Sequence, residues 1–249
     1  MMNEQTLEKM RTMKLYGMYR NFKHVLESPQ AGSLTADELL SQLVECEWDE
    51  RHNRAVERSL RNARFRYKAS LEMVDYSNPA RGIDKLQLAR LADCGFIEKR
   101  QNLIITGSTG TGKSFLASAI GNQACMKGYK VYYANTSRLL SNLKIAKADG
   151  PSIKELQRIE KQDLLILDDF GIQPLDSSSR MLLMEIIEDR HGKRSTLIAG
   201  QVPVSSWYDI IADQTIADAI LDRIVNDVHH IELQGESLRR KRKLEKEAE

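Results

Sequence analysis

A glycine-rich stretch followed by lysine and serine carries the most specific chemistry in this sequence. "GSTGTGKS" (107–114) matches G-x-x-x-x-G-K-[S/T] between an apolar run and a predicted helix. Backbone N–H groups of such a loop surround a phosphate, at a helix N-terminus whose dipole favours anions. Lys113 would reach the β- and γ-phosphates, and Ser114 would offer its hydroxyl to Mg²⁺. The predicted nucleotide-binding residues of this loop are Gly107, Ser108, Thr109, Gly110, Thr111, Gly112, Lys113, Ser114 and Phe115.

Two adjacent carboxylates end a second apolar run, "LLILDDFG" (164–171). Asp168 is expected at the end of a buried strand beside the phosphate loop, where it can bind Mg²⁺ through water. Asp169 would then orient or deprotonate the attacking water. Two acids after a strand could instead cap a turn, but their separation from "GKS" favours a second part of the nucleotide site. The chain contains no N-K-x-D sequence of the kind that reads guanine, so ATP is the expected nucleotide.

A polar side chain follows a third apolar run, in "STLIAGQVP" (195–203). Gln201 there could position the attacking water against the γ-phosphate. It could equally be an ordinary glutamine in the turn before Pro203. Both interpretations fit the sequence.

These motifs belong to a region in which apolar runs alternate with helical segments. The runs lie at 102–106, 130–134, 163–167, 195–200 and 229–233. Such alternation predicts an α/β fold, with a mostly parallel sheet between two layers of helices.

The part before residue 100 has the periodicity of helices. Residues 4–28 carry apolar side chains at helical spacing, with Gly17 as a soft point. "TADE" (35–38) has the form of a capping box, which predicts a long helix from there to about Arg64. The breakers in 67–82 mark a boundary, so we expect a small all-helical domain over residues 1–68 and an ATPase domain over 69–249.

The bulk composition is that of a globular protein of the cytoplasm. The chain has 249 residues and a net charge of +2, which neither requires nor excludes nucleic acid. Cys46, Cys94 and Cys125 have no paired spacing, so neither a disulfide framework nor a zinc site is expected. No apolar run approaches the length of a membrane span, and the first residues do not resemble a signal peptide.

Together these motifs, with "DAILDRI" (218–224) and "GESLRRKR" (235–242), resemble AAA+ ATPases of the initiator and helicase-loader clade. The chain looks most like IstB-type transposition helper ATPases, relatives of the DnaC helicase loader. "EWDER" and the arginine-rich helix leading to "ARFRY" also resemble that family. The resemblance covers nearly the whole chain and implies a P-loop AAA+ three-layer sandwich with a parallel five-stranded sheet.

The resemblance also implies roles for single residues. Gln201 corresponds to a sensor of the γ-phosphate, and Arg223 to an arginine finger presented to the nucleotide of the next subunit. Arg223 lies on the side of its predicted helix opposite the apolar face, as this role needs. Arg239 corresponds to a second sensor arginine that contacts the nucleotide. The chain departs from many AAA+ proteins in having Asp-Asp and Gln where they carry Asp-Glu and Asn, and in its lack of room for a full lid domain.

An arginine supplied in trans makes hydrolysis conditional on assembly, so ATP should stabilise a homo-oligomer, a ring or an open spiral. Basic side chains in two segments are candidates for binding duplex DNA without strong sequence specificity. They are Arg51, Arg54, Arg58 and Arg61 on the long helix, extended by Arg64, Arg66 and Lys68, and then Arg138, Lys144 and Lys147 after the second strand. Acidic neighbours also allow these residues to form a solvated, salt-bridged surface.

We therefore expect an ATP- and Mg²⁺-dependent ATPase that binds DNA, oligomerises, and assists a cognate transposase in selecting target DNA. The alternative within the family is a DnaC-like loader of a replicative helicase. A small-molecule kinase would need an acceptor pocket and an arginine-bearing lid, for which the sequence offers no clear candidate. A scaffold that binds ATP but hydrolyses it slowly is a further alternative, and the Asp-Asp pair is compatible with it.

Overall fold

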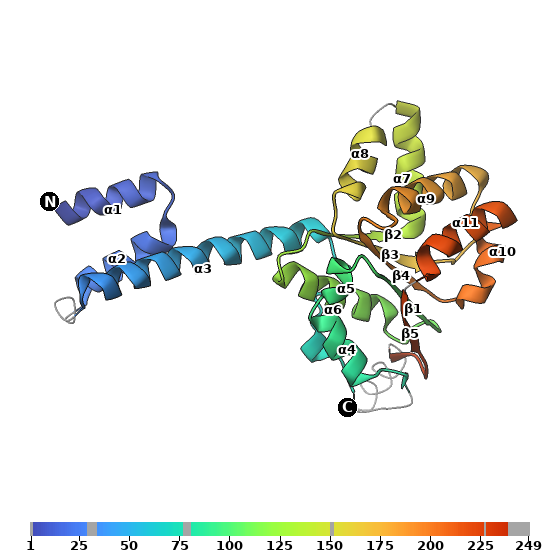
Figure 1. The fold of residues 1–249 in the computed structure, drawn as a ribbon, viewed down its shortest axis with the longest axis horizontal. Coiled ribbons are helices and arrows are strands. Elements are labelled where there is room, and N and C mark those ends of the chain that lie inside the picture. Colours follow the sequence, from blue (N-terminus) through green and yellow to red (C-terminus); the bar gives the residue numbers. More distant parts are fainter. Residues whose placement is uncertain (1, 29–33, 77–80, 150–151, 227, 239–249) are drawn as a thin grey trace, which may run out of the picture. The chain divides into compact units, whose positions relative to one another are not determined.

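Strands and helices alternate from residue 102 onward, and helices precede them (Figure 1). The computed structural model describes residues 2–28, 34–76, 81–149, 152–226 and 228–238. The first elements are α1 (Met2–Thr12), α2 (Tyr16–Glu27), α3 (Ala36–Ala63), η1 (Leu71–Met73), α4 (Lys85–Ala92) and α5 (Gly95–Glu98). The alternating part contains β1 (Asn102–Gly107), α6 (Lys113–Met126), β2 (Val131–Asn135), α7 (Thr136–Asp149), α8 (Ser152–Glu160), β3 (Leu164–Phe170), α9 (Ser177–Arg190), β4 (Ser195–Gly200), η3 (Val204–Ser206), α10 (Trp207–Ile211), α11 (Gln214–Val225) and β5 (Val228–Leu233).

In the described residues, five strands form one parallel sheet in the order β2-β3-β4-β1-β5, which confirms the predicted fold class. The three inner strands β1, β3 and β4 are nearly continuous buried runs. Such runs are typical of parallel strands that are covered on both faces. Because all the strands point the same way, the turns that follow β1, β3 and β4 meet at one edge of the sheet, which we call the carboxyl edge.

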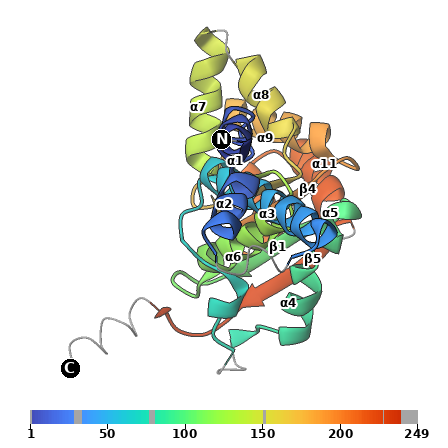
Figure 2. The same cartoon turned by 90° about the vertical axis from the view of Figure 1, so that its left-hand side faces the viewer.

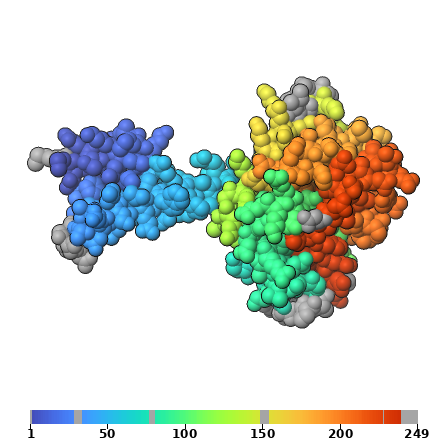
Figure 3. Space-filling model, viewed as in Figure 1, coloured from blue at the N-terminus to red at the C-terminus, as the bar shows by residue number. Residues whose placement is uncertain are grey.

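Helices cover both faces of the sheet (Figures 1 and 2). On one face, α4, α5 and α6 pack against Leu103, Ile105 and other strand residues of the same orientation. On the other face, α7, α9, α10 and α11 pack against the alternating set, which includes Ile104 and Leu165. In the space-filling view, α4 and α5 (green) and α9 and α11 (orange to red) form the surface around the strands (Figure 3). The arrangement is the three-layer sandwich expected from the alternation of elements.

The contacts divide the chain into two compact units, Met1–Arg58 and Ser59–Glu249. The boundary expected at residue 68 falls inside the second unit. Ala63 and Ala69 are both buried in that unit's core, on the α6 side of its sheet. The end of α3 and the segment after it therefore pack as part of the second unit.

Within the first unit, the long helix begins as its capping box predicts. The backbone N–H of Thr35 donates to Oε2 of Glu38 at 2.8 Å, and the N–H of Glu38 lies 3.3 Å from Oγ1 of Thr35. The helix ends at Ala63, where Arg64 takes a positive φ of 60°. The run over residues 4–28, by contrast, forms two helices.

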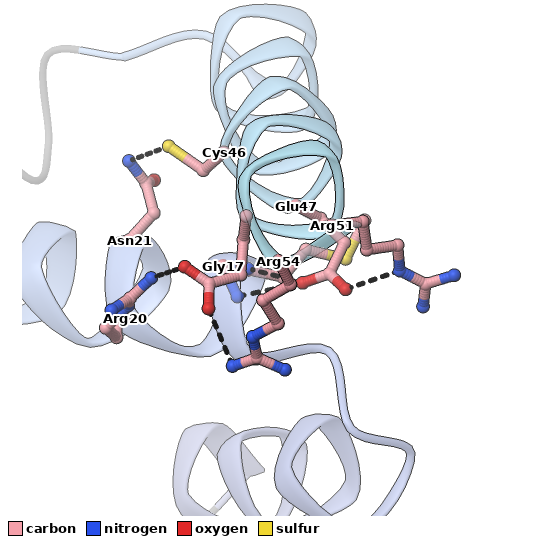
Figure 4. A network of polar contacts seen from close by, with 9 residues as sticks. Gly17, Arg20, Asn21, Cys46, Glu47, Arg51 and Arg54 are labelled. Atoms are coloured by element: carbon pink, nitrogen blue, oxygen red, sulfur yellow. Dashed lines mark hydrogen bonds and ion pairs between the residues drawn. The ribbon is translucent and has the colours of Figure 1, made fainter. Parts of the chain in front are cut away.

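The break between those helices lies before Gly17, at Lys14, whose φ is 59°. Gly17 instead lets α2 approach α3, because a Cβ there would lie 2.2 Å from the carbonyl oxygen of Cys46. The buried carboxylate of Glu47 accepts the N–H of Gly17 at 2.8 Å and pairs with Nε of Arg51 at 2.7 Å (Figure 4). The glycine is therefore required by the close helix contact.

Within the part of the chain that the structure describes, no helix is long and apolar enough to cross a membrane.

Candidate nucleotide site

The phosphate loop connects the end of β1 to the start of α6, as the motif predicts. Gly112 precedes α6 with a φ of 104°, and Gly110 has a φ of 86°. A Cβ at Gly110 would lie 2.1 Å from Oγ of Ser237, in the segment after β5. A side chain there would strain the backbone and displace that segment. The loop leads directly into the N-terminus of α6, a place that favours a bound anion.

Lys113 is buried at the centre of this loop. Its Nζ donates to the carbonyl oxygens of Gly107 at 2.7 Å and Ser108 at 2.8 Å. Oγ1 of Thr111 donates to the same Ser108 carbonyl at 2.8 Å. The loop's own carbonyls therefore keep the ammonium group next to the position where a β-phosphate would bind.

The two carboxylates lie at the carboxyl edge, on an irregular part of β3. The pairing of β3 with β4 shifts register between Leu167 and Phe170, so Asp168 and Asp169 fall outside the regular ladder. Asp169 has a positive φ of 56°, which is uncommon for a residue with a side chain. Such irregularities re-aim side chains and cluster at functional sites. Here Asp169 lines the same cavity as Lys113 and Ser114 of the phosphate loop, and Asp168 is buried next to it in the chain.

Asp168 is 1% exposed, and its surroundings keep it in place. The hydroxyl of Tyr133 donates to Oδ2 of Asp168, and Oγ1 of Thr136 donates to its carbonyl oxygen at 2.8 Å. Burial raises the pKa of Tyr133, and the hydrogen bond to Asp168 raises it further. The tyrosine therefore stays protonated and remains a donor to this carboxylate.

Asp169 accepts two hydrogen bonds on one oxygen. Its Oδ2 lies 2.9 Å from Nδ2 of Asn135, at the end of β2, and 2.8 Å from NH1 of Arg66. Sequence reasoning placed Arg66 on a DNA-binding stripe, whereas the structure places it at the nucleotide site. Asn135 received no role from the sequence. The motif "ARFRY" supported the family resemblance, but nothing in its sequence indicated that Arg66 contacts a carboxylate 103 residues away.

Gln201 lies directly after β4 and reaches the phosphate loop. Oγ1 of Thr109 donates to Oε1 of Gln201 at 2.7 Å. The side chain therefore adjoins the place where a γ-phosphate would lie. Gln201 therefore lies beside the phosphate loop, and its role in positioning water stays a prediction.

A cavity of about 660 Å³ joins these parts. Its polar lining residues include Lys113, Ser114, Asp169, Gln201 and Arg66, and its apolar lining residues include Val74, Ile83, Leu233 and Leu238. An apolar wall with a few convergent polar groups is typical of a small-molecule site. The apolar lining residues suit a flat base, and the polar lining residues suit phosphates.

Arg81 also lines this cavity and was missed by the sequence reasoning. Its guanidinium donates from NH2 to the carbonyl of Thr111 at 2.9 Å, so a buried cation supports the phosphate loop. The N–H of Gln234 donates to the carbonyl of Arg81 at 3.0 Å, which ties the same residue to the segment after β5. Its position in the breaker-rich stretch 67–82 suggested a domain boundary rather than a site.

The residues present fit a Mg²⁺ ion that is shared with phosphates. The hydroxyl-bearing Ser114 lines the cavity, and Asp168 supplies a buried carboxylate. Within the described ranges no group of three or more His, Cys, Asp or Glu side chains is placed to hold a metal. Mg²⁺ is usually bound by one or two protein oxygens together with water and substrate phosphates, so a small donor set is what this ion needs.

Arg223 lies far from this cavity in its own chain. It is in the last turn of α11, and its carbonyl accepts a hydrogen bond from Nδ2 of Asn102, the first residue of β1, at 3.1 Å. Its Nε lies 2.5 Å from Oε2 of Glu188, and NH1 donates to the carbonyl of Ala219 at 2.8 Å. The side chain is 25% exposed, so the sequence-based expectation of a side chain that simply projects from the helix is incomplete.

Several candidate DNA-binding residues are engaged in ion pairs. Arg51 pairs with Glu47 at 2.7 Å (Figure 4). Arg54 pairs with Glu50 at 2.6 Å and lies over the ring of Tyr16. On α7, Lys144 pairs with Asp176 at 2.7 Å, and Lys147 lies 3.9 Å from Glu185. Arg58, Arg61 and Arg138 are exposed. Arg239, the expected second sensor, lies outside the described residues.

Comparisons with known proteins agree over most of the chain. Residues 8–246 match the family described as IstB-like ATP binding protein. A protein named as an insertion sequence ATP-binding protein, y4pL of Sinorhizobium fredii, is 42% identical over 240 residues, covering 96% of this chain and 98% of that protein. A protein named for insertion sequence IS21 of Pseudomonas aeruginosa is 30% identical over 231 residues, covering 93% of this chain and 87% of that protein.

Solved structures share the fold. The DnaC helicase loader superposes with a TM-score of 0.55 and 23% identity, covering 68% of this chain and 98% of that chain. DnaA from Aquifex aeolicus superposes with a TM-score of 0.56 and 22% identity, covering 74% and 56% of the two chains. The match across the sequence, together with the phosphate loop and the carboxylates that meet it, shows that this chain belongs to the IstB-like ATP-binding proteins and is an ATPase with an AAA+ fold.

Proposed function

We propose that this ATPase assembles with copies of itself on duplex DNA when ATP is bound, and that the assembly assists a transposase in selecting target DNA. One observation carries the assembly step. The nucleotide cavity lies at the carboxyl edge of the sheet, and Arg223 lies at the opposite edge.

The length of β1 gives the separation between Arg223 and the nucleotide cavity. The strand begins at Asn102, which contacts Arg223, and ends at Gly107 in the phosphate loop. Five steps of about 3.3 Å along this strand separate them by roughly 17 Å. An arginine side chain does not span that distance, so Arg223 can act on a nucleotide only if another copy holds it. Two different edges would then meet head to tail, which generates a ring or an open spiral.

The cavity residues divide the chemistry among them. Lys113 and the N–H groups of the phosphate loop bind and orient the β- and γ-phosphates. Asp169 accepts the proton of the attacking water or orients it, and Gln201 positions that water. Ser114 and Asp168 would hold Mg²⁺, which would neutralise charge on the phosphates. The trans arginine completes the site, and such a residue contributes roughly 10³–10⁵ in rate.

The DNA contact is proposed for the basic residues of α3 and α7. Contacts with phosphates are independent of base sequence and weaken steeply with salt. The acidic partners of Arg51, Arg54, Lys144 and Lys147 lower the net positive field, so part of the binding depends on DNA replacing those partners. A transposase is the proposed partner because relatives similar over nearly the whole chain are named for insertion sequences.

Mixing two inactive variants tests the assembly step. Lys113→Ala removes the phosphate-binding lysine and keeps Arg223, whereas Arg223→Ala keeps the nucleotide site and removes the arginine. Each variant alone should lose ATPase activity by at least about 10³-fold, and mixing them with DNA and ATP should restore a measurable fraction, because one copy then completes the site of the other. Arg223→Lys serves as the control that keeps the charge without the fork geometry.

A mixture as inactive as its components would contradict catalysis in trans, as would an Arg223→Ala protein that hydrolyses ATP at the wild-type rate. Electron microscopy with duplex DNA and a slowly hydrolysed ATP analogue should show rings or spirals. Binding of the assembled protein to the transposase encoded with it, and not to a replicative helicase, is the expected result for the partner.

A further inference from the structure

The segment that follows α3 is anchored against the nucleotide site by two aromatic side chains. The ring of Phe65 meets the ring of Tyr133 edge-on, with centroids 6.2 Å apart. It also fills the space beside Gly121 of α6, where a Cβ would lie 2.5 Å from the Phe65 ring. The ring of Tyr67 packs against Phe115, with centroids 6.3 Å apart. The backbone between these two anchors therefore has a defined position beside the phosphate loop.

Arg66 is the residue between the two anchors. Its NH1 lies 2.8 Å from Oδ2 of Asp169 and 3.6 Å from Oδ2 of Asp168. The side chain is 41% exposed and lines the nucleotide cavity. Phe65 and Tyr67 pack against the core, whereas the guanidinium of Arg66 contacts the carboxylates of Asp168 and Asp169.

Two adjacent carboxylates, one of which lines the cavity beside an anion-binding loop, need a cation nearby. Without one, their charges repel each other and also repel the phosphates of an incoming nucleotide. In the structure the guanidinium of Arg66 provides that positive charge. A divalent ion bound to Asp168 would approach the same two oxygens, so the ion and the guanidinium compete for them.

We propose that Arg66 is a positioning residue that occupies the place of the divalent ion beside Asp168 and Asp169, and that it gives way when Mg²⁺ enters with ATP. The inference rests on the roles given to Asp168 and Asp169 in the proposed function. It makes Arg66 a residue that sets how strongly nucleotide affinity depends on the metal. It also makes the segment after α3 sensitive to the nucleotide.

The experiment measures nucleotide affinity with and without metal. The Kd of the full-length protein for a fluorescent, slowly hydrolysed ATP analogue is determined in excess Mg²⁺ and in a chelator. For Arg66→Ala, the ratio of the Kd in chelator to the Kd in Mg²⁺ should exceed the wild-type ratio by about tenfold, because metal-free ATP then meets uncompensated carboxylates. A role in folding alone would raise both values equally and leave the ratio unchanged.

Two variants serve as controls. Arg66→Lys keeps the charge, so its ratio should stay within about twofold of the wild-type ratio. Arg194→Ala removes a matched ion pair at the other edge of the sheet, where Arg194 lies 2.8 Å from Asp163 with 46% of its side chain exposed. Its ratio should equal that of the wild type.

An unchanged or lower ratio in Arg66→Ala would overturn the inference. So would a rise that Arg66→Lys fails to restore, since shape rather than charge would then be responsible. The roles that the proposed function gives to Asp168 and Asp169 are tested separately by the wild-type protein. Its affinity for the ATP analogue should be higher in Mg²⁺ than in chelator, whatever the result for the Arg66 variants.

Discussion

Glu188 holds Arg223 in a conformation that a trans-acting arginine has to leave. Oε2 of Glu188 lies 2.5 Å from Nε of Arg223, and the two side chains are 53% and 25% exposed. In the proposed assembly, this ion pair would be exchanged for a contact with the phosphates of a neighbouring nucleotide. Glu188→Gln removes the charge of the competing partner and keeps a side chain of similar size.

The expected gain follows from the exposure of the pair. An exposed ion pair is worth about 0–1 kcal/mol, and more than half of the Glu188 side chain is exposed, so about 0.5 kcal/mol is a suitable value. Release of this amount shifts the equilibrium toward the free arginine by about twofold, because 1.4 kcal/mol corresponds to a factor of ten. The gain should decrease at high salt, which screens the wild-type pair.

The assay is steady-state ATP hydrolysis without DNA, at a protein concentration where assembly limits the rate. Glu188→Gln should hydrolyse ATP about twofold faster than the wild type and should assemble at a lower protein concentration. Glu185→Gln is the matched control, because Glu185 lies on the same helix α9 and only approaches Lys147, at 3.9 Å. It should behave as the wild type.

A rate for Glu188→Gln that equals or falls below that of Glu185→Gln would refute the reasoning. Glu188 would then hold Arg223 in the conformation that hydrolysis needs, rather than compete with the nucleotide phosphates for it.

Two further substitutions test single carboxylates. Asp169→Asn should lower kcat by about 10²–10⁴-fold, because it removes the group that accepts a proton, while the affinity for an ATP analogue changes by less than about threefold. Wild-type turnover in this variant would assign the proton transfer to another group. Asp176 caps α9, and its hydrogen bond from Lys144, followed by one from the backbone at the start of α9, lowers its pKa to about 2. Because this value lies below the unfolded one, the carboxylate contributes stability above about pH 4 that is lost as the pH falls toward 2. The free energy of unfolding of Asp176→Asn, which keeps the cap, should therefore lie below the wild-type value at pH 6 and approach it near pH 2; a constant difference would contradict the assignment.

Features that depend on neighbouring residues in the chain were predictable. The phosphate loop, the five strands and the Thr35 capping box all follow from patterns within about ten residues. Local backbone geometry decides them, since a run of buried β-branched and leucine side chains or a Thr-x-x-Glu sequence selects its own conformation. The break at Lys14 was not predictable in the same way, because helical spacing continues through it.

Contacts between distant segments were not predictable. Arg66 looked like part of a basic helix surface, and its contact with Asp169 exists because Phe65 and Tyr67 fix the chain against α6 and β2. Glu188 and Arg223 meet because α9 and α11 pack on the same face of the sheet. Neither pairing has a signature in the local sequence.

The sequence by itself determined that this protein binds a nucleotide on a parallel α/β fold, because the residues that bind phosphate are consecutive and need only a strand before them and a helix after them. The tertiary structure decided which charges face one another. It brings Arg66 to the carboxylates of β3 and places Arg223 at the opposite edge, since strand order and direction, rather than any local pattern, set which residues share an edge of the sheet.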